Sequence, residues 1–111
     1  MHTEDITVVV VGADTRDGMR WLHRRFPDAP RRGRVIILLR PGGELEGVLW
    51  SEPLRAEARG AGARLSIGLA TLRADLDLRE ATAEAATAYR RAFDIGGDLI
   101  VTASALVQRA A

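Results

Sequence analysis

Four apolar segments along the chain have the pattern of β-strands. ITVVVV at residues 6–11 is a β-branched run that ends at Gly12, which favours a strand covered on both faces. VIILL at 35–39 has the same character, and LIVTA at 99–103 is a short closing strand. RLSIGLAT at 64–71 alternates large with small side chains. We therefore expect its large side to build core and its small side to admit a closely packed helix.

The first polar segment between strands carries helix signals. Asp14 or Thr15 can cap a helix that ends at Pro27, because the residue before proline avoids helical dihedrals. Apolar residues at helical spacing predict one buried stripe, formed by Met19, Leu22 and Phe26.

The second helical segment has an ambiguous start. GELEGVLW at 43–50 fits either a returning strand or the approach to a helix. We favour the approach to a helix, because SEPLRAEARG at 51–60 offers Ser51 as a cap, a proline in the first turn and Gly60 at the end.

A third helix is predicted from a capping box, Asp77 with Glu80, to about Phe93, with Gly96 and Gly97 ending it. Alanines at helical spacing predict its buried seam: Ala81, Ala85, Ala88 and Ala92. Strands that alternate with helices predict an α/β sandwich with a mixed central sheet of four to five strands and about three helices. We expect residues 1–111 to form a single domain, since the length fits one compact core.

Composition narrows the classes of function. The chain has no cysteine, which excludes disulfide and zinc–thiolate chemistry, and the two histidines are too far apart in sequence to form a metal constellation. His23 lies away from the apolar stripe and is expected to be exposed, and His2 lies in the N-terminal tail. A net charge of +1 argues against a general nucleic-acid or membrane-surface binder, and a cytoplasmic protein is expected.

The charge is concentrated in one stretch. RRFPDAPRRGR at 24–34 holds five arginines and one aspartate, a net of +4, so the remaining residues sum to −3. Such a run forms either a local anion site or a solvated basic loop.

Residues 35–103 resemble the C-terminal half of GGDEF domains, the diguanylate cyclase family. The resemblance rests on the VIILL strand with a PG break at 41–42, the LSIGLA strand at 65–70 and a helix bearing AYRRA at 88–92 before a glycine turn. In the family the corresponding strand reads like SIGVA and the last helix like ADxALYxAK. The resemblance implies a nucleotidyl-cyclase-like α/β fold.

The departures from the family concern its catalytic groups. RRGR at 31–34 stands where the family has its Gly-Gly-Asp/Glu-Glu hairpin, so we expect that hairpin to be absent. Gly12 stands where a metal-binding aspartate would be, which leaves only Asp14 nearby, and the 26–34 connection is too short for the usual additional helix. Joining nucleotides needs carboxylates that hold divalent metals. We therefore expect no catalytic residue, no metal site and no cofactor.

The family also implies a candidate ligand. An RxxD motif ahead of the hairpin binds cyclic di-GMP in GGDEF domains, and Arg25 with Asp28 spells RxxD in about that place. Arg31 and Arg32 would add further contacts, since guanidinium groups grip phosphates and guanine edges in bidentate fashion. The alternative is coincidence, because a second RxxD occurs at 91–94 in a chain with sixteen arginines.

Two hypotheses for function follow. The first is a non-catalytic GGDEF-like regulatory domain that acts through protein contacts, with a cyclic dinucleotide as candidate ligand at Arg25, Asp28, Arg31 and Arg32. The second is a ligand-free α/β interaction or dimerisation domain. A homodimer or a partner protein is expected in both, because apolar surface is predicted on the open sheet edge or in the tail LVQRAA at 106–111.

Overall fold

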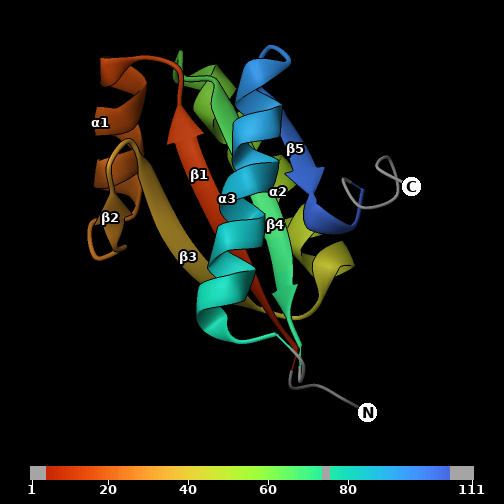
Figure 1. Ribbon diagram of the computed structural model, residues 1–111. Helices are drawn as coiled ribbons and strands as arrows, with labels where there is room; N and C mark the ends of the chain where they lie inside the picture. Colours follow the sequence, from red (N-terminus) through yellow and green to blue (C-terminus); the bar gives the residue numbers. More distant parts are fainter. Residues whose placement is uncertain (1–4, 74–75, 106–111) are drawn as a thin grey trace.

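The computed structural model describes residues 5–73 and 76–105 (Figure 1). The predicted tail at 106–111 and His2 lie outside these residues. In chain order the elements are β1 (Ile6–Ala13), α1 (Arg16–Arg25), β2 (Arg31–Arg32), β3 (Val35–Pro41), α2 (Glu44–Gly60), β4 (Leu65–Leu72), α3 (Leu78–Asp94) and β5 (Leu99–Thr102). Among the described residues, no helix combines the length and the apolar character that a membrane span requires.

The strands form one mixed sheet in the order β2-β3-β1-β4-β5. β1 is antiparallel to both β3 and β4, and β5 runs parallel to β4. The central position of β1 explains its β-branched sequence, because Val8–Val11 are almost completely buried. The α/β architecture and the mixed sheet predicted from the sequence are confirmed.

The helices cover the two faces of the sheet unequally. Leu22 of α1 and Leu54 of α2 belong to one core, together with Leu65, Ile67 and Leu69 of β4. Ala81 and Ala85 of α3 belong to a second core on the other face. Figure 1 shows α3 lying across the near face of the sheet, with α2 behind it. One face therefore carries two helices and the other carries α3 alone.

Contact between α3 and β4 depends on Gly68. A Cβ atom at this position would lie 2.1 Å from the carbonyl oxygen of Ala85 and 2.2 Å from the backbone nitrogen of Tyr89. The predicted alanine seam of α3 is fully buried, and the Asp77–Glu80 capping box is formed as predicted. Small residues on both surfaces thus allow the helix to lie directly on the strand.

The predicted start of α2 was wrong. The helix begins at Glu44, not after a cap at Ser51, and Ser51 and Pro53 lie inside it. The physical reason is an earlier start signal, because the Glu46 carboxylate accepts a hydrogen bond of 2.9 Å from the Gly43 N–H. Ser51 is instead buried within the helix.

Two further predictions from the N-terminal half are corrected. A hairpin does precede β3: Arg31 pairs with Ile36 and Arg32 with Val35, and Gly33 makes the tight turn possible with φ of +63°. This hairpin lies close to α1 (Figure 1), and His23 is half-buried there rather than exposed. Its Nε2 atom is shielded and has no hydrogen-bond partner among the described residues.

Candidate functional site

A groove of about 1050 Å³ lies on the α3 face of the sheet, over β3. Its floor consists of Val35, Ile37 and Leu39, which lie on the α3 face of the sheet at β3, the strand that α3 leaves uncovered. One wall is the first half of α3, where the lining side chains are small or apolar: Leu78, Thr82, Ala83 and Ala86. The opposite wall is the 25–30 segment, and Arg32 and Arg79 stand at the rim. The groove is therefore apolar inside and basic at its edge.

The 25–30 wall is held against the sheet by local contacts. α1 ends at Arg25, and the chain returns to β2 through a connection that contains two prolines. The Ile37 N–H donates to the Pro30 carbonyl at 3.0 Å, which extends the β2–β3 pairing into this connection. The Phe26 ring packs against the Trp50 ring with centroids 6.0 Å apart. The wall is thus tied to β3 on one side and to α2 on the other.

The structure brings only three of the four predicted ligand-site residues to the groove. Arg25, Asp28 and Arg32 line the groove, whereas Arg31 does not. Arg31 and Arg32 are neighbours on a strand, so their side chains point to opposite faces. Arg31 instead affects His23 of α1. The pKa of His23 lies below its ordinary 6.5, mainly because the side chain is partly buried and also because the positive charge of Arg31 is nearby.

The arginines that line the groove differ in whether they have ion-pair partners. The Arg25 Nε atom lies 3.1 Å from Glu57 of α2, and its guanidinium lies over the Phe26 ring, 4.9 Å from the ring centroid. Among the residues that the structure describes, Arg32 and Arg79 have no ion-pair partner. Arg25 therefore acts partly as a structural tie, and the free positive charge at the rim belongs to Arg32 and Arg79.

The end of β1 is filled by an aromatic side chain. A Cβ atom at Gly12 would lie 2.7 Å from the Tyr89 hydroxyl oxygen and 2.9 Å from a ring carbon. Burial raises the pKa of Tyr89, and the nearby Asp94 acts in the same direction, whereas Arg34 and Arg90 oppose the rise. Asp14 is exposed, and within residues 5–73 and 76–105 no three acidic or histidine side chains gather in a way that would hold a metal ion.

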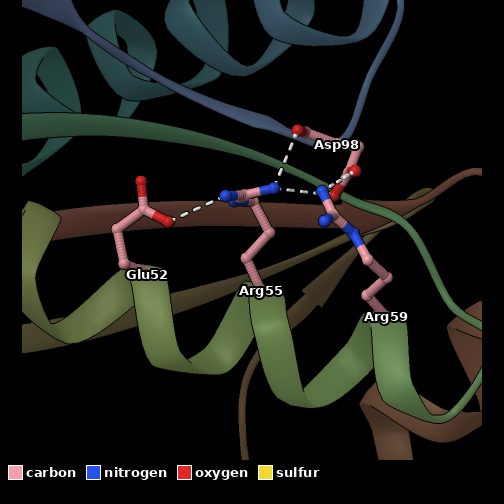
Figure 2. A network of polar contacts seen from close by, with 4 residues as sticks. All are labelled: Glu52, Arg55, Arg59 and Asp98. Carbon is pink, nitrogen blue, oxygen red and sulfur yellow. Dashed lines mark hydrogen bonds and ion pairs between the residues drawn. The ribbon is translucent and has the colours of Figure 1, made fainter.

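A second polar cluster joins α2 to the turn between α3 and β5. Arg55 donates to the Asp98 carboxylate at 3.1 Å and to Glu52 at 2.9 Å, and Arg59 also pairs with Asp98. Figure 2 shows both arginines extending from α2 toward Asp98. The Asp98 side chain is only 12% exposed, and its backbone has φ of +57°. Because each oxygen of its carboxylate pairs with an arginine of α2, this cluster holds the turn between α3 and β5 against α2.

Sequence reasoning missed this cluster and the groove floor. The partners of Asp98 lie 43 and 39 residues earlier in the chain, so no local sequence pattern predicts these ion pairs. The groove exists because α3 lies over β4 and β1 and leaves β3 open, which depends on helix placement. In β3 only Ile36 is buried and Leu39 is exposed, so the apolar run at 35–39 gave no local signal that this strand would be left partly open.

Comparison with known proteins supports the fold. No family model and no curated protein matches the sequence. A solved structure of a microbial GGDEF domain, described for its interaction mode with bis-(3′,5′)-cyclic di-GMP, matches with a TM-score of 0.71 at 17% sequence identity. The match covers 89% of this chain and 77% of that chain. The chain has a GGDEF-like fold. The resemblance seen in residues 35–103 is thereby confirmed at the level of fold, and the match covers more of the chain than those residues.

Proposed function

We propose that the chain is a non-catalytic GGDEF-like regulatory domain that acts by binding, and that the arginine-rimmed groove is its binding surface. The observation that carries the proposal is the convergence of Arg25, Asp28 and Arg32 on one groove with an apolar floor. The mixture of apolar floor and a few polar groups at the edge is the usual make-up of a ligand site.

The ligand that fits this chemistry is a cyclic dinucleotide. Its phosphates would pair with Arg32 and Arg25, and the Asp28 carboxylate would accept hydrogen bonds from the amino edge of a guanine. A base would rest on the apolar floor over Val35 and Ile37. The similar microbial GGDEF domain was studied with cyclic di-GMP, which makes that compound the first probe.

The absence of catalysis is proposed from what occupies the relevant positions. Tyr89 fills the space beside Gly12, where a carboxylate would be needed to hold metal over a triphosphate. The β2–β3 turn consists of Gly33 and Arg34 and offers a guanidinium in place of an acidic group. We expect no cyclic di-GMP to form when the protein is incubated with GTP and Mg²⁺.

Isothermal titration with cyclic di-GMP tests the binding proposal. We expect a micromolar Kd for the natural chain and a loss of about 10- to 100-fold in Arg32→Ala, because a charge-assisted hydrogen bond contributes about 1.5–3 kcal/mol. Arg31→Ala is the matched control, since it removes the same side chain from the same strand outside the groove. Binding that is equally weakened by both variants, or the absence of heat at millimolar ligand, would refute the proposal.

A further inference from the structure

Two exposed apolar surfaces lie on opposite sides of the molecule. The first is the groove, whose Leu39 and Leu78 are 51% and 48% exposed. The second, which we name the α2 ridge, consists of Leu45 and Leu49, exposed by 66% and 62%, together with the adjacent Glu46 and Glu52. Leucine side chains are exposed at a cost in free energy, and an exposed apolar patch with a polar rim is a candidate contact surface.

The groove is bordered in the way that a helix site would be. The opposite face of the sheet carries both α1 and α2, whereas α3 alone lies on this face and leaves β3 open (Figure 1). A second helix placed beside α3 would complete the layer. The wall of α3 that faces the groove presents Ala83 and Ala86, and such small residues permit close approach of another helix.

The α2 ridge has the composition that such a site requires. Leu45 and Leu49 are one helical turn apart, so they form a continuous apolar strip. Residues 44–54 contain three glutamates and no basic residue. The N-terminal part of α2 is therefore an acidic amphipathic helix whose apolar strip faces outward.

The charges of the two surfaces are opposite. Arg32 and Arg79 stand at the groove rim without acidic partners among the described residues. On the ridge, Glu52 is already paired with Arg55, whereas Glu46 accepts only the Gly43 N–H and has no ion-pair partner among the described residues. We propose that the α2 ridge of one copy docks in the groove of a second copy, with Leu45 and Leu49 on the groove floor and the Glu46 carboxylate opposite a rim arginine. This is a helix-in-groove contact. It rests on that part of the proposed function which assigns the groove to binding.

The position of the two surfaces determines the form of the assembly. They lie on opposite faces of the sheet, so two copies do not bury both surfaces reciprocally. The contact is heterologous, and each copy offers one ridge and one groove. Association therefore continues beyond two copies, into open chains or a closed ring. A single helix in a groove buries a small area, below about 1,200 Å², which is typical of transient contacts.

Sedimentation velocity on the full chain tests the proposal. We expect the natural chain to increase in mass beyond two copies as its concentration rises, with a Kd on the order of 100 μM or tighter. Leu49→Asp removes the ridge and Ala83→Arg blocks the groove. Because Leu49 and Ala83 are both exposed, both variants should fold, and circular dichroism checks this. Each variant alone is expected to stay at the monomer mass of 12.0 kDa.

A mixture of the two variants provides the decisive observation. The Leu49→Asp copy retains its groove and the Ala83→Arg copy retains its ridge, so an equimolar mixture should form a one-to-one complex of about twice the 12.0 kDa monomer mass and nothing larger. Glu84→Arg, which places an arginine on α3 outside the groove lining, should associate like the natural chain. A monomeric natural chain at millimolar concentration, a discrete dimer unaffected by either variant, or a monomeric mixture would each overturn the proposal.

Failure of this contact is distinguishable from failure of the proposed function. Leu49 does not line the groove, so Leu49→Asp should bind cyclic di-GMP with the affinity of the natural chain. Dinucleotide binding without self-association refutes only the docking contact. Self-association without dinucleotide binding refutes only the proposed ligand.

Discussion

Glycine positions decide the packing at the scale of single residues. At Gly68 a methyl group would overlap the backbone of α3, which cannot move without shifting the whole helix. We predict that Gly68→Ala lowers the free energy of unfolding by about 3 kcal/mol or more, at the upper end of overpacking effects. Urea denaturation monitored by circular dichroism measures this change.

Substitutions at two other glycines serve as comparisons for Gly68→Ala. Gly12→Ala meets the far end of the Tyr89 side chain, which can rotate away, so its cost should be about 1 kcal/mol. Gly60→Ala has no heavy atom within 4 Å of the new methyl group and lies at the end of α2, so it should be neutral or stabilising by up to about 1 kcal/mol. Equal effects of all three substitutions would show that backbone overlap at Gly68 is not the cause.

Asp98 links two elements, α2 and the α3–β5 turn, through Arg55 and Arg59 (Figure 2). Asp98→Asn keeps the shape of the side chain and its tolerance of positive φ while removing the charge. We predict that the variant loses about 2 kcal/mol of stability at pH 7, as for a hydrogen bond to a charged partner. Asp17→Asn is the control, because its ion pair with Arg20 is exposed and should contribute less than about 1 kcal/mol.

Because Asp98 is held by ion pairs, its contribution to the stability of the fold should depend on pH. Burial of the Asp98 carboxyl acts most strongly and would raise its pKa, but hydrogen bonds and charges of Arg59 and Arg55 together lower the pKa below its ordinary 3.8. The unfolded chain therefore binds the proton more readily, and the stabilisation is present above pH 3.8 and lost as pH falls through the lower folded pKa. The difference in free energy of unfolding between the natural chain and Asp98→Asn should be constant near pH 7 and should become smaller below pH 3.8. A difference that widens on acidification would contradict the ionised link.

At the scale of elements, the sequence predicts what local physics determines. The β-branched run of β1, the Asp77–Glu80 box and the alanine seam of α3 each follow from rules that act within a few residues. The start of α2 was missed because Ser51 resembled a cap, although Gly43 with Glu46 carried an equivalent signal. The local signals were present, and the error lay in choosing between two of them.

At the scale of the whole molecule, local rules no longer suffice. The RxxD at Arg25 and Asp28 could be read from the sequence, but the groove beside it depends on where α3 lies across the sheet. The division of Arg31 from Arg32 likewise required β2, which the sequence did not predict. Distant packing creates the site, and the sequence supplies the residues that border it.

The two proposed occupants of the groove require the same groups. A cyclic dinucleotide would use Arg32 and the apolar floor, and the α2 ridge of another copy would use the same arginine and floor. One groove cannot hold both at once. Competition at one site is a negative coupling, and thermodynamic linkage makes it reciprocal. The ligand would then release copies from the assembly, and the assembly would weaken the ligand's apparent affinity.

We therefore predict that saturating cyclic di-GMP returns the natural chain to its 12.0 kDa monomer mass in sedimentation velocity. In titrations, the apparent Kd of the natural chain should rise with protein concentration, because a larger fraction of grooves is then occupied by the α2 ridge. Leu49→Asp cannot fill the groove of a neighbour, so its Kd should not depend on protein concentration. An increase in mass on adding the ligand would instead place the dinucleotide and the ridge at separate sites.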